Sequence, residues 1–242
     1  PFTCKLTELN HNTVYHVRAY AKKGSDYYYG ADKTFTTEEK PSGNGTYNGH
    51  DYIDLGLPSG TLWATCNVGA ETPEGIGSYF AWGETTTKAD YDWSTYKYCN
   101  GSGNTLTKYC NDANYGYNGY TDELVVLQPE DDAATANWGS GWRMPTIEEC
   151  EELVNNTTYT WTTQNDMWGG LFTSENGNSI FVPATQTYLY GQYWGGDYWS
   201  SSLASHPDCV LRLVFGSSAV GAGGNNWYRY DGNSVRPVRS TK

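Results

Sequence analysis

Alternation of apolar and polar positions predicts strands along most of the chain. The clearest example lies near the C-terminus, where a strand with one buried face is predicted. Its buried face holds Leu211, Leu213 and Phe215, and its other face holds Arg212, Val214 and Gly216. Residues 216–226 (GSSAVGAGGNN) are rich in glycine and asparagine, which favour loop conformations, so a loop is expected to follow this strand.

Shorter segments of the same kind predict further strands in the middle of the chain. They cover residues 52–55, 62–67, 123–127, 159–162, 170–173 and 179–183. Residues 77–84 (GSYFAWGE) are typical of a buried segment. Residues 85–120 are rich in Thr, Tyr, Asn and Gly and show little periodicity, so they are predicted to form long surface loops.

Two helices are predicted between these strands. The first has Pro129 at its first position and acidic residues in its first turn, where the helix dipole favours them, and it runs to Gly139. The second begins at a capping box formed by Thr146 and Glu149. Its apolar face holds Ile147, Cys150, Leu153 and Val154. The expected fold class is therefore α+β, with small antiparallel sheets, two helices and long loops.

The N-terminal residues 1–38 alternate as strands and are expected to form a separate segment. A turn before Tyr15 is typical of the tyrosine corner of β-sandwiches, and the segment resembles the last three strands of a fibronectin type III domain. A spacer role is the simplest interpretation. Residues 39–49 are rich in Pro, Gly, Ser and Asn and predict a linker, so the main domain is placed at residues 50–242.

Charge and composition narrow the function classes. The net charge is −12, with 15 basic against 27 acidic residues, and no basic stripe is present, which argues against a nucleic-acid partner. No run of 18 apolar residues predicts a membrane span. The 22 Tyr and 10 Trp residues instead predict a wide aromatic surface. Six cysteines lack C-x-x-C spacing; Cys99 and Cys110 either pair in an oxidising compartment or remain free thiols.

Several motifs carry a resemblance to a known family. In chain order they are YIDLGLPSGTLWATCNVGA, YFAWGE, EDDAA, WGSGWRMPT, YWSSS and SVRPVR. Residues 52–239 thereby resemble bacterial surface domains with the C-type lectin fold, which include a formylglycine-generating-enzyme-like branch, Fibrobacter-type paralogous domains and the variable proteins of diversity-generating retroelements. The resemblance implies that residues 52–55 pair with residues 235–238, and that Trp142 and Trp199 lie in the core.

The retroelement branch implies a function for the C-terminal segment. There, errors copied at adenines rewrite codons that are mostly AAC, and codons ending in C cannot encode Lys, Gln, Glu, Met or Trp. Residues 204–224 contain none of these five types, which make up 38 of the 242 residues. The implied ligand-binding residues are Ala204, His206, Asp208, Cys209, Arg212, Val214, Gly216, Ala219, Gly221, Ala222, Gly223, Asn225, Asn226, Trp227, Tyr228, Tyr230 and Asp231.

Among these, the residues expected to anchor a ligand are His206, Arg212, Trp227, Tyr228 and Tyr230. The expected ligand is a protein or glycan on another cell or a phage, bound without a cofactor or metal. The expected location is the bacterial cell surface or outside the cell. The start at Pro1 is interpreted as a processed form, with any lipid anchor in an upstream region.

Other functions are weighed on the same residues. Formylglycine-generating enzymes use two reactive cysteines in their C-terminal half, but only Cys209 lies there, so no enzymatic activity is expected and Cys209 is interpreted as an exposed, displayed residue. His206 and Asp208 are interpreted as two loop residues without a catalytic or metal-binding role, although a metal site or a catalytic dyad is the functional alternative. The acids at 130–132 are explained more simply by their interaction with a helix dipole than by a calcium-binding site. A fixed-specificity glycan-binding or adhesin module stays the alternative.

Overall fold

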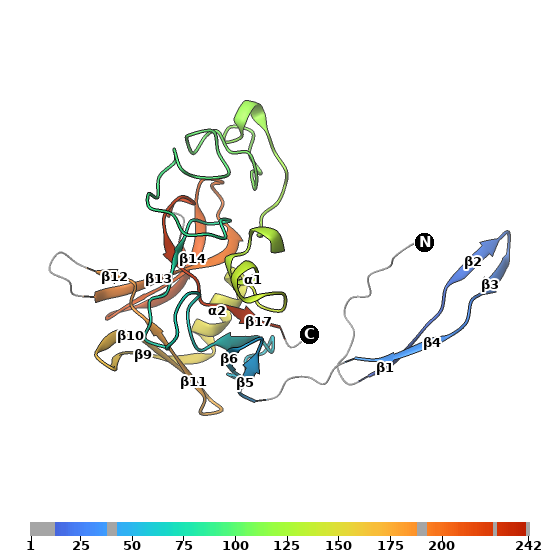
Figure 1. The fold of residues 1–242 in the computed structure, drawn as a ribbon, viewed down its shortest axis with the longest axis horizontal. Coiled ribbons are helices and arrows are strands. Elements are labelled where there is room, and N and C mark those ends of the chain that lie inside the picture. The colour runs from blue at the N-terminus through green and yellow to red at the C-terminus, as the bar shows by residue number, and fades with distance from the viewer. Residues whose placement is uncertain (1–12, 38–42, 188–192, 225–226, 241–242) are drawn as a thin grey trace. The chain divides into compact units, whose positions relative to one another are not determined.

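The computed structural model describes residues 13–37, 43–187, 193–224 and 227–240 (Figure 1). Residues 13–37 belong to one compact unit and residues 43–240 form another. Each unit is described by itself.

The first unit contains two pairs of antiparallel strands. β1 (Val14–Val17) pairs with β4 (Lys33–Thr36), and β2 (Tyr20–Lys23) pairs with β3 (Asp26–Tyr29). The alternating residues 14–23 form two strands, β1 and β2, which have different partners. The residues before Thr13, which include part of the predicted tyrosine corner, lie outside the described residues, and the fibronectin-like identity of the segment stays a prediction.

The second unit begins with a four-stranded sheet. It comprises β5 (Gly45–Tyr47), β6 (His50–Ile53), β7 (Leu62–Ala64) and β17 (Val238–Arg239), in the order β17-β7-β6-β5. Strand β5 lies in the predicted linker. Asn48 and Gly49 have φ values of 51° and 82°, as a tight hairpin turn requires, and Asn-Gly is the dipeptide that favours it.

The predicted pairing of residues 52–55 with residues 235–238 was wrong. Val238 is opposite Trp63 of β7 instead. The reason is that β6 already has a partner strand on each side, β5 from the hairpin and β7, so neither edge of β6 is free for the C-terminal strand. The C-terminal strand β17 therefore pairs with β7, the strand that follows β6 in the chain.

A second sheet of six strands carries the C-terminal segment. It comprises β8 (Tyr79–Phe80), β12 (Gln186–Thr187), β13 (Tyr193–Leu203), β14 (Val210–Gly216), β15 (Val220–Gly223) and β16 (Asn233–Ser234). Its order is β15-β14-β13-β16-β8, and β12 pairs with β13. The predicted loop after residue 216 was wrong in part, because β15 follows a short turn and forms backbone hydrogen bonds with β14, which need no side chain.

The third sheet is an antiparallel meander of β9 (Thr157–Gln164), β10 (Met167–Ser174) and β11 (Ser179–Pro183). It confirms the strands predicted at 159–162, 170–173 and 179–183, the first two being longer than predicted. The strand predicted at 123–127 was wrong, because the only pairing described there is a single bridge between Val126 and Ser202.

The helices are α1 (Ala133–Trp138) and α2 (Ile147–Asn155), with single 3-10 turns at Tyr117–Gly119 and Pro129–Asp131. The capping box of α2 is confirmed. Helix α1 begins later than predicted, since Asp132 is its N-cap and accepts from the Thr135 amide at 2.9 Å. The prediction of acidic residues in the first turn of this helix was wrong: Asp131 and Asp132 are each 3 % exposed and are buried acceptors, Asp131 for Lys108 and Tyr109 and Asp132 for the Met144 amide as well.

Two hydrophobic clusters form the core of the second unit. One surrounds Trp82, Trp142 and Trp199, and the other packs α2 against Leu213 and Phe215. Trp142 and Trp199 are 1 % and 0 % exposed, so their predicted burial is confirmed. The unit thus consists of small, mostly antiparallel sheets with two α-helices, as predicted, and β13 and β16 are a parallel pair (Figure 1).

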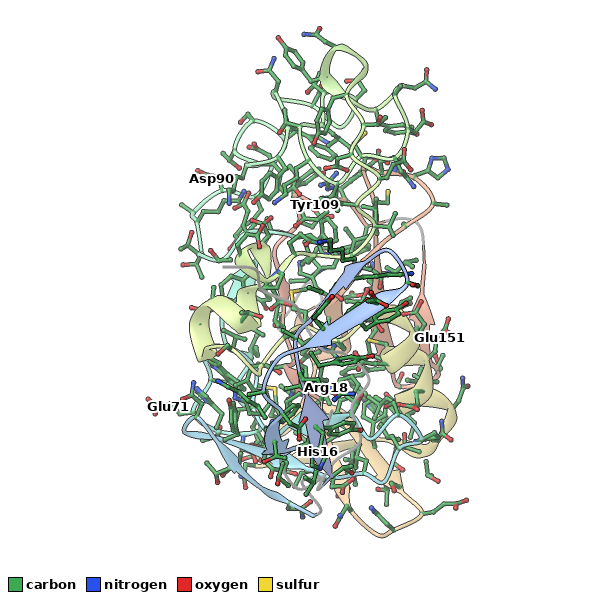
Figure 2. All side chains as sticks on the ribbon, turned by 90° about the vertical axis from the view of Figure 1, so that its right-hand side faces the viewer. His16, Arg18, Glu71, Asp90, Tyr109 and Glu151 are labelled. Atoms are coloured by element: carbon green, nitrogen blue, oxygen red, sulfur yellow. The ribbon has the colours of Figure 1, made fainter. Side chains whose placement is uncertain are left out.

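The prediction that residues 85–120 are surface loops was wrong in part. The segment is irregular, but it sends large side chains inward: Tyr96, Tyr98, Leu106, Tyr109 and Cys110 are buried. Figure 2 shows Tyr109 among other side chains in the interior, while Asp90 lies at the periphery. The hydroxyls of the buried tyrosines find internal partners, which removes the cost of burying them.

Replacing Trp142 tests the core directly. Its ring is buried and its Nε1 donates to the Tyr47 carbonyl at 3.1 Å, so Trp142→Ala is expected to lower the free energy of unfolding by about 3–5 kcal/mol. Trp168→Ala is the matched control, because Trp168 is 43 % exposed, and it should cost much less. Urea denaturation of both variants measures the difference. Equal losses would contradict the core assignment.

Candidate ligand-binding surface

Strand β14 separates a packed face from an open face. Leu213 and Phe215 are 1 % and 3 % exposed and lie in the core cluster that contains α2. The alternate residues Arg212, Val214 and Gly216 are partly exposed, as the period-two pattern predicts. The predicted burial of Leu213 and Phe215 and the outward positions are therefore confirmed, whereas Leu211, also predicted on the buried face, is only partly buried.

The neighbouring strand β15 extends this open face with glycine. Gly221 is opposite Val214 and Gly223 is opposite Arg212, so both glycines share the open face. A Cβ atom added to either would meet nothing within 4 Å. By contrast, Ala222 is opposite Leu213 and packs against the α2 cluster, so it does not belong to the open face.

An arginine held by a carboxylate and an indole occupies this face. The Nε of Arg212 lies 2.7 Å from Oδ1 of Asp197, and its Cζ lies 3.9 Å from the centroid of the Trp227 ring. The ion pair lacks the geometry of a hydrogen bond. Nε and Nη1 of Arg212 and Oδ1 of Asp197 have no hydrogen-bond partner among the described residues. Because both of these nitrogens are buried, Arg212 is fixed in place by Asp197 and Trp227 and does not offer them to a ligand.

Burial governs the electrostatics of this group. Asp197 is 2 % exposed, and desolvation raises its pKa to about 6, although the Arg212 guanidinium acts in the opposite direction. Burial also raises the pKa of Asp231. Its Oδ2 accepts a hydrogen bond from the Tyr228 amide at 3.1 Å, and its carboxylate interacts electrostatically with Arg212. Asp197 was missed in the sequence because it lies on β13, outside the segment 204–231.

A second group is aromatic, and we call Trp93, Tyr228 and Tyr230 the aromatic cluster. The two tyrosine rings stack at 5.4 Å with an angle of 17° between their planes. Trp93 meets both edge-on, at 5.8 Å from Tyr228 and 4.8 Å from Tyr230. Trp93 comes from the long irregular segment, and only the tertiary structure brings it to the C-terminal segment.

His206 and Asp208 lie beside the aromatic cluster. Nδ1 of His206 is 3.0 Å from the Tyr115 hydroxyl, and His206 is exposed. The Cβ of Asp208 and the Trp93 ring both lie within 3.3 Å of the point where a Cβ on Gly103 would stand, so the two residues are neighbours. His206 therefore contacts Tyr115 and Asp208 lies near Trp93, so both are placed against the irregular segment.

Two predicted site residues are buried. Ala204 is 4 % exposed and Cys209 is 5 % exposed, so the prediction of Cys209 as an exposed, displayed thiol was wrong. The reason is the turn between β13 and β14, in which the amide of Ala204 donates to the Cys209 carbonyl and both side chains face inward. Burial raises the pKa of the Cys209 thiol to about 12. Ala219 is exposed at the β14–β15 turn, and Asn225 and Asn226 lie outside the described residues.

The described residues offer little for other chemistry. No group of three or more His, Cys, Asp or Glu side chains among them could hold a metal ion. Cys99 and Cys110 are free thiols, so the alternative of a disulfide between them is not realised; their sulfurs donate to the carbonyls of Trp93 and Asp112 instead. Within the described ranges, the helices are too short and too polar to span a bilayer.

Comparison with protein-family models, with curated proteins and with solved structures gave no match.

The buried carboxyl of Asp197 predicts a pH dependence. Its pKa of about 6 in the folded protein lies above the model-peptide value of 3.8, so the folded state holds this proton when the unfolded chain has released it. The stabilisation is complete below about pH 4 and is lost as the pH rises through about 6, by roughly 2–3 kcal/mol.

Denaturation of the protein and of Asp197→Asn at pH 4 and pH 7.5 measures this effect. The contributions of all other titrating groups to the free energy of unfolding cancel in the difference between the two proteins. The protein should lose stability relative to the variant as the pH rises. A constant difference between the protein and Asp197→Asn would contradict the assignment.

Proposed function

We propose that residues 43–240 form a non-enzymatic ligand-binding domain that presents side chains of residues 204–231 on a fixed frame. The observation that carries the proposal is the two-sided strand β14, whose one face is locked into the core while the other is open. With Ala204, Cys209 and Ala222 assigned to the frame, the other described positions of the predicted site are partly or fully exposed. Such a segment can change its surface chemistry without changing its packing.

The glycines of the sheet support this division. A Cβ on Gly196 of β13 would lie 2.4 Å from the Phe215 ring, so this glycine is needed for the strands to pack. Gly221 has open space around its Cβ position and an ordinary backbone φ. One glycine therefore belongs to the frame, and the other leaves its position free for a side chain.

We infer that the domain has the C-type lectin fold and is a variable protein of a diversity-generating retroelement, exposed at the bacterial surface or outside the cell. The small sheets with two helices are compatible with this fold. The five residue types that AAC-derived codons cannot encode are absent from residues 204–224, which include the open face of β14 and β15. The frame residues Leu213 and Phe215 alternate with the outward positions inside that segment.

Substitutions at the two glycines test the division. Gly221→Tyr is expected to change the free energy of unfolding by less than about 0.5 kcal/mol, because the side chain enters open space. Gly196→Ala is expected to cost about 1–3 kcal/mol, because its Cβ collides with Phe215. Thermal denaturation compares the two. A Gly221→Tyr variant as unstable as Gly196→Ala would sink the proposal of an open display face.

Diversification is tested by sequencing the gene across one growing population. Substitutions are expected only at adenines in codons between those of Ser202 and Val235, and they should fall on outward positions. The codons for Leu213 and Phe215 are the internal control and should not vary. Variation spread evenly over both kinds of codon would contradict a retroelement origin.

The alternative is a glycan-binding module of fixed specificity. The aromatic cluster favours it, because exposed stacked rings next to polar groups such as Asp208 suit the apolar faces and hydroxyls of sugars. This function requires one class of sugar as ligand and a C-terminal segment that does not vary. A glycan array distinguishes it from the proposed function.

A further inference from the structure

The aromatic cluster of Trp93, Tyr228 and Tyr230 presents rings that face no cation from the described part of the chain. Tyr228 is 42 % exposed, and the other two rings are partly exposed. Elsewhere in the unit, Lys or Arg groups lie over aromatic rings, as Lys97 does over Tyr98. Among the residues that the structure describes, no Lys or Arg lies over a ring of the aromatic cluster.

Carboxylates surround the same rings. Asp208 lies next to Trp93, and Asp231 is bonded to the Tyr228 amide. Asp92 directly precedes Trp93 and is exposed. Burial and then the charges of Asp231 and Asp92 raise the pKa of Tyr230, which agrees with this placement. These carboxylates make the potential at the rings more negative, while the guanidinium of Arg229, between Tyr228 and Tyr230 in the chain, is fully buried and bonded to the Tyr96 hydroxyl and to backbone carbonyls.

Arg212 shows what such a combination binds. Its guanidinium lies 3.9 Å from the Trp227 ring centroid and pairs with the Asp197 carboxylate at 2.7 Å. Carboxylate and ring together hold the cation, because the ring face and the carboxylate both carry negative potential. The aromatic cluster offers the same two components, without a cation from the described chain.

We propose that the aromatic cluster binds a cationic side chain, arginine or lysine, of a protein partner. The inference rests on the proposed function, of which it names the ligand chemistry. Electrostatic attraction to a domain of negative net charge speeds the encounter, and the rings fix the position of the cation. Tyr228 is the main contact, since it is the most exposed ring of the cluster.

A hexa-arginine peptide with blocked ends is the probe, and a hexa-citrulline peptide of nearly the same shape without charge is its comparison. Fluorescence anisotropy of the labelled peptides gives Kd. The protein is expected to bind hexa-arginine at least tenfold more tightly than hexa-citrulline. Tyr228→Ala should weaken the binding of hexa-arginine roughly fivefold, and Tyr228→Phe should leave it nearly unchanged because the ring remains.

Two charge variants separate a specific site from general attraction to an acidic protein. Asp208→Asn and Glu151→Gln each remove one negative charge, but Glu151 is on the exposed surface of α2. Only Asp208→Asn is expected to weaken the binding of hexa-arginine, roughly threefold. Equal effects of the two variants, or Tyr228→Ala binding as tightly as the protein, would overturn the cationic site. Melting temperatures check that each variant is folded.

The outcome is independent of the tests of the proposed function. The Gly221→Tyr substitution and the population sequencing need no ligand. If Gly221→Tyr is tolerated but the protein shows no preference for hexa-arginine, the cationic ligand is overturned and the proposed display function is not. Binding of hexa-arginine that depends on Tyr228, in a domain destabilised by Gly221→Tyr, overturns display and leaves a fixed cationic site.

Discussion

The buried guanidinium of Arg229 is the interaction on which the candidate surface depends. Arg229 is 0 % exposed, and its nitrogens donate to the Tyr96 hydroxyl at 3.0 Å and to the carbonyls of Tyr109, Pro207 and Lys108 at 3.1, 3.0 and 2.8 Å. A buried charge is tolerated only when its donors are satisfied, and these bonds do so with groups from the irregular segment and the C-terminal segment. Arg229 therefore fixes both segments against each other.

The hydrogen bonds of Arg229 also position the aromatic cluster. Tyr228 and Tyr230 flank Arg229 in the chain, so the direction in which they leave the core is set by the arginine between them. Trp93 completes the cluster from the irregular segment that Arg229 holds in place. A buried, hydrogen-bonded charge thus positions the exposed ring of Tyr228 and the partly buried rings of Trp93 and Tyr230, which also pack against the core.

A second buried arginine, Arg236, also joins segments that are distant in the chain. Arg236 is 1 % exposed and donates to the Asn67 side chain and to the carbonyls of Ala64, Thr65 and Phe181. These acceptors lie on or next to different sheets, so one side chain joins them. Rigidity in such a domain comes from satisfied buried polar groups as much as from its two hydrophobic clusters. That rigidity would let a binding face vary without loss of the fold.

The sequence by itself determined the elements whose signals are local. The alternation of Leu211, Leu213 and Phe215, the capping box at Thr146 and the meander strands depend on neighbours in the chain, and each is seen in the structure. Only the tertiary structure decided which positions of the C-terminal segment are exposed. Cys209 is buried by a turn, and Asp197 and Trp93 join the surface from distant segments, because burial and charge pairing depend on packing that no local pattern encodes.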